Sequence, residues 1–158
     1  GLPEDTDQRA MATADAIIGL GPDFVRIYPT LVLADSALGR RFNEGRYRPL
    51  ALSHCVTLVK KLFKRFNNHG IPVVRMGLQP SEDLDKPGTV LAGPYHPAFG
   101  MLVYSEMVLD ALSDYIRSGN GLSTLIIRVH PKNVSNVRGL KNFNLGVLKK
   151  NTTSPGLS

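Results

Sequence analysis

The order of elements along the sequence predicts an α/β fold with parallel strands. A helix with apolar residues at helical spacing, a glycine stop and a short apolar strand follow one another twice, over residues 5–29 and 52–80. This succession is typical of parallel strands covered by helices, and not of a β-sandwich or a helical bundle. The composition suits one packed domain's worth of chain, because 42% of the 158 residues are hydrophobic and 20% are charged.

The first half of the chain contains the elements of this layer. Asp5 or Thr6 is the expected N-cap of a first helix, which Gly19 ends. Four further elements are expected in order: a strand at 24–29, a short helix at 36–43, a long amphipathic helix at 52–68 that Gly70 ends, and a strand at 71–80.

The second half begins with a loop rich in glycine and proline at 83–100. A helix at 98–117, a strand at 123–131 and two short helices joined near Gly139, the second over 140–150, are expected after it. We expect three regions: a barrel part at 1–93, a basic C-terminal domain at 94–150 and a disordered tail at 151–158.

Each of the two repeated strands carries an arginine, Arg26 and Arg75, in an equivalent place. Because side chains alternate along a strand, Arg26 should share a face with Phe24 and Tyr28, opposite Val25 and Ile27. In the second strand, the apolar set should be Val74, Met76 and Leu78, opposite Val73, Arg75 and Gly77.

A parallel strand covered by helices on both faces is apolar on both, so a cationic face indicates a ligand cavity. This pattern predicts a barrel or open half-barrel of β/α units, in which ligands bind at the carboxyl ends of the strands. Four residues are the candidates for binding a substrate or cofactor anion in the lumen: Arg26, Tyr28, Arg75 and Gln79. The alternative is an arginine near a strand end that reaches solvent or a surface carboxylate.

Several segments, in this order, carry a family resemblance: "GLPEDT", "PDFVRIYPTLVL", "RYRPL", "IPVVRMGLQP" and "VLAGPYHPAF". Together they resemble the later part of radical S-adenosylmethionine (SAM) proteins, in a short branch related to the catalytic subunit of elongator that lacks its acetyltransferase domain. Coproporphyrinogen-oxidase-like members are similar more loosely. The resemblance covers residues 1–112.

The resemblance implies a 4Fe–4S cluster held by a C-x-x-x-C-x-x-C loop, and bound SAM that is cleaved reductively to a deoxyadenosyl radical. The one cysteine, Cys55, lies mid-helix among apolar residues and is expected to be a core residue, not a cluster ligand. The resemblance assigns Thr30, Leu31, Gly1 and Leu2 to SAM contact. No metal ligand is assigned.

The resemblance therefore implies the later half of a partial TIM-type (β/α) barrel, followed by a small basic α/β module. We expect this chain to be part of a longer enzyme, inactive by itself and without cofactors of its own. Its partners should be the missing N-terminal half of the barrel or, for the isolated chain, a second copy in a homodimer or a swapped oligomer. No apolar run reaches the roughly 18 residues that a membrane span needs, and we expect a cytoplasmic protein with no membrane partner.

The remaining titratable candidates for a functional role are four histidines and one tyrosine. Tyr95 and His96 are clustered in the loop before the third long helix, where a histidine before proline is expected to form a structural hydrogen bond. His54 and His69 are expected on a helix surface and His130 at a strand end.

The charge of the chain is concentrated at its C-terminal end. Residues 115–158 hold seven of the 19 Lys and Arg and none of the 13 Asp and Glu, so residues 1–114 carry 12 − 13 = −1. Such asymmetry indicates a polyanion-binding end, with nucleic acid the commonest polyanion, or else a solvated basic face. The candidate nucleic-acid contacts are Arg128, Lys132, Arg138 and Lys141.

A strand, a helix, a glycine loop and a helix with interspersed cations also partly resemble a KH module, although Asn142 replaces the second glycine of its G-x-x-G loop. Three functions stay open. The first is part of a radical SAM enzyme that acts on RNA, with tRNA favoured by analogy with elongator. The second is a non-catalytic RNA-binding module, and the third is a porphyrinogen-oxidising relative.

Overall fold

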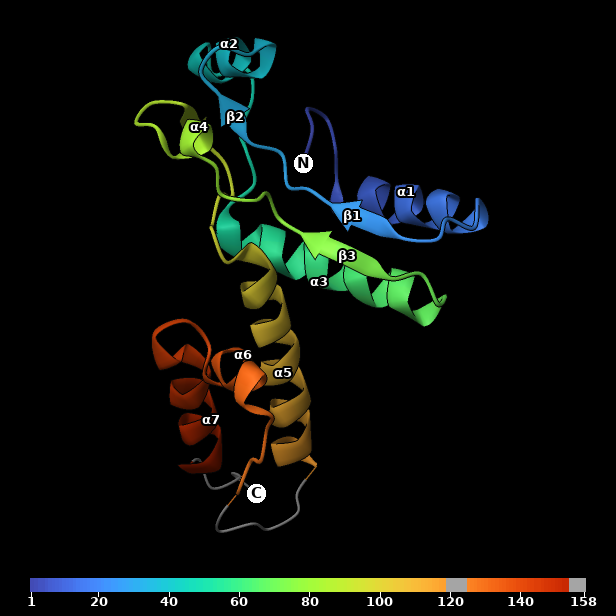
Figure 1. Ribbon diagram of the computed structural model, residues 1–158, viewed down its shortest axis with the longest axis vertical. Coiled ribbons are helices and arrows are strands. Elements are labelled where there is room, and N and C mark those ends of the chain that lie inside the picture. The colour runs from blue at the N-terminus through green and yellow to red at the C-terminus, as the bar shows by residue number, and fades with distance from the viewer. Residues whose placement is uncertain (119–124, 154–158) are drawn as a thin grey trace, which may run out of the picture. The chain divides into compact units, whose positions relative to one another are not determined.

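The computed structural model describes residues 1–118 and 125–153, and the side chains of 1–118 and 125–150 (Figure 1). The chain forms two compact units, Gly1–Gly100 and Met101–Ser158. We describe each unit by itself. Helices and short strands alternate as the sequence predicts, which confirms the α/β class.

The first unit begins with helix α1 (Asp7–Gly19), whose N-cap Thr6 accepts a hydrogen bond from the Arg9 backbone amide. Strand β1 (Val25–Ile27) follows, then helix α2 (Ala37–Asn43), which Ser36 caps. Helix α3 (Leu52–Asn68) has the predicted bounds, and Gly70, at a left-handed φ of 73°, follows its end. Strand β3 (Val73–Met76) pairs with β1 in parallel, as the repeated pattern predicts.

One face of the β1–β3 pair packs on α1 and α3. Val25, Ile27 and Val73 contact a buried cluster that includes Ala14 and Phe66. The predicted faces of β1 are confirmed, since Phe24, Arg26 and Tyr28 are exposed while Val25 and Ile27 are partly buried. Burial of the helix-facing side chains supplies the main stabilisation of this unit.

The predicted faces of β3 are wrong at two positions. The pairing register moves from Val25 opposite Val73 to Arg26 opposite Arg75, so Val74 is an extra residue in the ladder. Because of this bulge, Val73 faces the helices while Val74 is 54% exposed. Arg26 and Arg75 nevertheless occupy equivalent places, as partners across the two strands.

A second pair of strands, β2 (Val32–Leu33) and β4 (Val90–Ala92), is antiparallel and lies within segments where the sequence pattern predicts no strand. Helix α4 (Glu82–Asp85) is also absent from the sequence-based expectation. Val32 is fully buried and pairs with Ala92. This ladder brings the chain after β1 next to the residues that follow β4.

Helices α1 and α3 run side by side in the same direction. Asp7 near the start of α1 contacts His54 at 2.8 Å and Lys61 at 3.9 Å, and Asp15 further along accepts a 2.6 Å hydrogen bond from Arg65. The Arg65 guanidinium holds the pKa of Asp15 below its ordinary value. His54 on α3 and His69 at its C-cap are both exposed, as predicted for surface residues.

The second unit contains most of helix α5 (Phe99–Arg117), helix α6 (Val134–Arg138) and helix α7 (Phe143–Thr153), with single turns η1 (Pro131–Asn133) and η2 (Leu140–Asn142). The two helices joined near Gly139 are therefore confirmed. Two described elements differ from expectation. Residues 125–130 form no strand, because no strand in the described part of this unit lies beside them to pair with. Residues 151–153 of the expected tail are helical, and 154–158 lie outside the described residues, as do 123 and 124 of the expected strand.

A buried amide holds α5, α6 and α7 together. Asn144 is 2% exposed, and its Nδ2 donates to the Ser105 carbonyl at 2.9 Å, to Ser105 Oγ at 3.0 Å and to the Asn136 carbonyl at 3.2 Å. Gly139, at φ 72°, leaves room for this amide, because a Cβ there would lie 2.8 Å from Asn144 Oδ1. Over the part of the chain that the structure describes, no helix has both the length and the apolar character to cross a membrane.

Candidate functional site

The candidate site of the first unit lies at the carboxyl ends of β1 and β3. After β1 the chain continues through Thr30 and Leu31, both partly buried, into β2. Gly93 follows β4 and approaches this segment closely, since a Cβ on it would lie 3.1 Å from the Thr30 carbonyl oxygen and 3.2 Å from the Leu31 Cα. A side chain at position 93 would therefore displace the backbone at Thr30 and Leu31.

Sequence reasoning missed the role of Gly93. The pattern that could have revealed it is the short apolar run at 90–92 followed by Gly-Pro, which is typical of a strand that ends in a close backbone approach.

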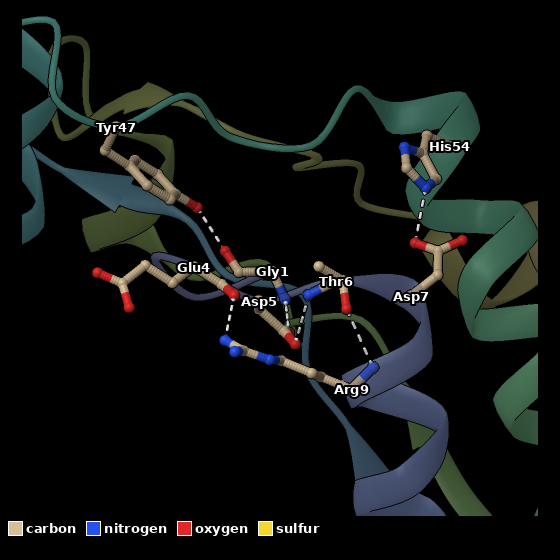
Figure 2. A network of polar contacts seen from close by, with 8 residues as sticks. All are labelled: Gly1, Glu4, Asp5, Thr6, Asp7, Arg9, Tyr47 and His54. Atoms are coloured by element: carbon tan, nitrogen blue, oxygen red, sulfur yellow. Dashed lines mark hydrogen bonds and ion pairs between the residues drawn. The ribbon is translucent and has the colours of Figure 1, made fainter.

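The N-terminal segment folds back onto the same region (Figure 2). The Tyr47 hydroxyl donates a 2.5 Å hydrogen bond to the Gly1 carbonyl, and Arg9 Nη1 donates to the Glu4 carbonyl at 2.7 Å. Burial raises the pKa of Tyr47, and the negative charge of Asp5 adds to this effect. The donor therefore stays protonated at neutral pH.

Of the four residues assigned to SAM contact, the structure brings three into one region. Gly1 lies beside Thr30, because a Cβ on Gly1 would be 3.8 Å from the Thr30 Cβ and 3.2 Å from Leu50 Cδ1. Leu31 follows Thr30 in the chain. The fourth residue, Leu2, is 66% exposed.

The end of β3 is held by a second close approach. Gly77, at a left-handed φ of 83°, is buried, and a Cβ on it would lie 2.5 Å from the Phe99 Cβ. Its backbone amide donates to the Ile27 carbonyl at 3.0 Å, so the two strand ends stay in register. The geometry fixes where the residues after each strand leave the sheet.

The residues proposed for anion binding lie on the face of β1 and β3 that the helices do not cover. Arg26 pairs with Arg75 across the strands, both side chains are exposed, and Tyr28 is 47% exposed. Gln79 accepts a 2.7 Å hydrogen bond from Arg75 Nη1. Neither arginine forms an ion pair within 1–118 or 125–150. Two adjacent cations without a carboxylate can bind an anion such as a phosphate or carboxylate.

A groove of about 620 Å³ runs along β1 beside α1. Its walls are mainly apolar, with Ala14, Ile17, Val25 and Phe66 among them, and Arg26 and Tyr28 also belong to its lining. Among the described residues β1 pairs only with β3, so its other edge is open at this groove.

Cys55 is a core residue, as predicted. It is 3% exposed, and burial raises the pKa of its thiol to about 11. A thiol in this state is a poor metal ligand, because metals bind the thiolate. Within the described ranges no three His, Cys, Asp or Glu side chains come together as a metal site.

The loop before α5 has a structural role. His96 Nδ1 accepts a 3.1 Å hydrogen bond from the Ala98 amide, which confirms the predicted type of contact. The Tyr95 hydroxyl donates to Asp85 at 2.7 Å, and this bond raises the pKa of Tyr95. His130, predicted at a strand end, instead caps η1 by accepting from the Lys132 amide at 3.3 Å.

The candidate nucleic-acid contacts all lie on the surface of the second unit. Arg128, Lys132, Arg138 and Lys141 are exposed. Lys141 adopts a left-handed φ of 51° in the turn between α6 and α7, where the sequence had suggested a partial G-x-x-G loop. No acidic residue occurs from 115 to 158, and the acids of the second unit, Glu106, Asp110 and Asp114, all lie on α5.

Comparison with known proteins gives one positive result. A search of curated proteins found no match, and neither did a search of solved structures. The family profile described as the Radical_SAM C-terminal domain matches residues 22–108, which include β1, β3, β4 and both arginines. Since the matched segment is more than half of the 158 residues, this chain belongs to the radical SAM C-terminal domain family.

Proposed function

We propose that this chain forms the later part of the (β/α) barrel of a radical SAM enzyme that acts on RNA. The observation that carries the proposal is the parallel β1–β3 pair with Arg26 opposite Arg75 on the face free of helices, inside the matched family segment. In a β/α barrel this face lines the lumen, and ligands bind at the carboxyl ends of the strands.

The family implies SAM and a 4Fe–4S cluster in the whole protein. The residues of this chain do not fit the cluster, because its one cysteine is buried and has a pKa of about 11. The cluster ligands must therefore come from another part of the whole protein. When bound there, the cofactors supply reductive cleavage of SAM to a deoxyadenosyl radical.

The residues at the strand ends fit a different task, which is contact with SAM. Thr30 offers a hydroxyl and Leu31 an apolar side chain, and Gly93 permits the close packing that positions both. Gly1 lies beside Thr30, where the Tyr47 hydroxyl holds its carbonyl in place. Arg26 and Arg75, with Tyr28 and Gln79, would bind an anionic group of the substrate or cofactor.

Two measurements test this part of the proposal. Iron and labile sulfide in the purified chain should be absent, and a bound cluster would overturn it. In the whole enzyme, Thr30→Val should raise the KM for SAM several-fold in an assay of 5′-deoxyadenosine release, because one hydrogen bond to the cofactor is lost, worth about 1 kcal/mol. The matched control is Thr13→Val, the same change at an exposed residue of α1 that borders the apolar groove and not the strand ends. Equal KM values for both variants would contradict the assignment.

For the substrate we propose RNA, with tRNA first by analogy with elongator. The charge of residues 115–158 supports RNA more strongly than this fold-level analogy, because the segment holds seven cations and no acid, and Asp114 just before it pairs with Arg117. A porphyrinogen-oxidising enzyme is the alternative. It predicts tetrapyrrole binding, and it does not account for the basic end.

The partners of the chain follow from the open edge of β1. We propose that a further strand of the parent barrel pairs there and covers the apolar groove, and that an isolated chain covers it with a second copy. Light scattering of the isolated chain should show dimers or larger species, and a monomer at every concentration would count against the idea.

A second candidate function, which the exposed cations favour, is a non-catalytic RNA-binding module. The test is tRNA binding at several salt concentrations with Arg138→Gln/Lys141→Asn, where asparagine suits the left-handed backbone of position 141. Loss of two phosphate contacts should reduce the slope of log K against log salt by about 1.4. Binding that neither salt nor this double change affects would exclude the module.

A further inference from the structure

The second unit contains a groove that the proposed function has not used. It has a volume of about 620 Å³, within the range of roughly 300–1,000 Å³ that is typical of ligand sites. Its floor is apolar and comes from α5, from the segment before η1 and from α6, with Val108, Ala111, Leu112, Ile127 and Val137 as members.

Two amides line this groove, and the fold of the described residues does not use them. Asn133 is the N-cap of α6, but its side chain forms no capping hydrogen bond. The Asn136 side chain also forms none within 1–118 and 125–150, although its backbone carbonyl accepts from Asn144. Each amide presents a donor and an acceptor side by side.

An aromatic ring and a positive rim complete the surroundings. Tyr104 lines the groove and is 38% exposed. Three exposed cations adjoin lining residues in the chain: Arg128 between Ile127 and Val129, Lys132 before Asn133, and Arg138 after Val137. By the same criterion Glu106 and Asp110 adjoin Met107 and Ala111 on the α5 side, so the cations attract an anionic ligand from the side of η1 and α6.

We propose that this groove binds one unstacked base of single-stranded RNA, with adenine preferred. The apolar floor and Tyr104 would cover the faces of the base, the amide of Asn133 or Asn136 would pair with its N6 and N7, and the rim cations would contact the flanking phosphates. This inference rests on the proposed RNA-binding function and names the part of the RNA that is read.

An acidic peptide would satisfy the cations equally well. Its backbone N–H and C=O can also pair with a side-chain amide, but that backbone has no flat aromatic ring for the apolar floor and Tyr104 to cover. Adenine combines such a ring with an edge that pairs with an amide, so the tyrosine beside the two amides favours the base over the peptide.

The test uses fluorescence anisotropy of the full chain with labelled 12-mers of three kinds: oligo(A), oligo(U) and an abasic ribose-phosphate chain of the same length. The wild-type protein should bind oligo(A) more tightly than the other two. Asn133→Ala/Asn136→Ala should weaken oligo(A) binding by about 5- to 150-fold, as expected for a lost bidentate contact, and leave abasic binding within about twofold. Ser135→Ala, on the exposed surface of α6 and outside the groove, is the matched control.

A second variant tests the same groove in case Asn133→Ala/Asn136→Ala does not fold. Ala111 is exposed at the groove, so Ala111→Trp should fill it without disturbing a packed core, and should remove the preference for oligo(A). Circular dichroism and the salt slope of abasic binding should stay at wild-type values in both variants, since all cations remain.

The outcomes distinguish failure of the base pocket from failure of RNA binding as a whole. If oligo(A) and the abasic chain bind equally tightly to the wild type, the base pocket is wrong while RNA binding through phosphates stands. If an acidic peptide displaces oligo(A) from the wild type but not from Ala111→Trp, the groove is a peptide site and the base pocket is again wrong. If none of the three oligomers binds even at low salt, RNA binding itself fails.

Discussion

Replacement of Asn144 should loosen the second unit more than any surface substitution. The amide is 2% exposed, and Nδ2 donates to Ser105 O, Ser105 Oγ and Asn136 O. Asn144→Ala removes these bonds and leaves Ser105, itself 5% exposed, without its partner. Since Nδ2 has two hydrogens, we count two net bonds of about 1 kcal/mol each and a further penalty of about 1–2 kcal/mol for the buried hydroxyl, which gives roughly 3–4 kcal/mol.

Hydrogen exchange read by mass spectrometry localises this effect. Amides in α7 should lose protection by about 140- to 700-fold, because each 1.4 kcal/mol is a factor of ten, while amides in α1 of the other unit should keep theirs. Ser135→Ala is the control and should change protection by less than about threefold. If Asn144→Ala exchanges like the control, the amide does not hold these helices together and the reasoning is refuted.

Two further predictions concern the first unit. Gly77→Ala should lower the free energy of unfolding of this unit by about 2–5 kcal/mol in urea, because the residue has a left-handed φ and its Cβ would lie only 2.5 Å from the Phe99 Cβ. The control Gly70→Ala, at a similar φ but with open space around the Cβ, should lower it by about 1 kcal/mol. Equal losses for the two variants would contradict the packing argument. The pKa of Cys55 is raised from 9.0 to about 11, so the folded state holds its proton longer than the unfolded state. The stability from this difference is complete well below pH 9 and is lost as pH rises through 11. About 1 kcal/mol of it should be gone at pH 10, and Cys55→Val should lose about that much less than the wild type, since the raised pKa values of Tyr47 and Tyr95 give both proteins the same further loss.

The sequence could predict elements whose information is local. The bounds of α3 agree with the structure because seventeen residues of amphipathic spacing end at a glycine that tolerates a left-handed φ. The equivalence of Arg26 and Arg75 was also readable, since both follow the same helix, glycine and valine pattern.

Features that depend on pairing between distant residues could not be read. The bulge at Val74 arises from the register against β1, and it reverses which valine of β3 faces the helices. Strands β2 and β4 are too short for any periodicity to identify them. Conversely, the apolar run at 125–130 has strand-like composition, yet Ile127 and Val129 line a groove instead.

The candidate site shows the same division. Residue types and spacing predicted that the two arginines occupy equivalent places on adjacent strands and that the basic residues gather at the C-terminal end. The approach of Gly93 to Thr30 depends on the β2–β4 ladder, and the groove with Asn133 and Asn136 is formed by both α5 and α6. Neither feature could be predicted from the sequence, because each joins residues that are distant in the chain.

Binding of tRNA at several salt concentrations tests the central proposal most directly, with two matched pairs of neutralised cations. Arg138→Gln/Lys141→Asn alters the C-terminal segment that holds no acidic residue, and Arg26→Gln/Arg75→Gln alters the strand face of the first unit. The account predicts that the first pair lowers the slope of log K against log salt by about 1.4 and that the second pair lowers it by less than half as much. A slope that the first pair leaves unchanged would contradict the proposal that the basic end of this radical SAM C-terminal domain binds RNA.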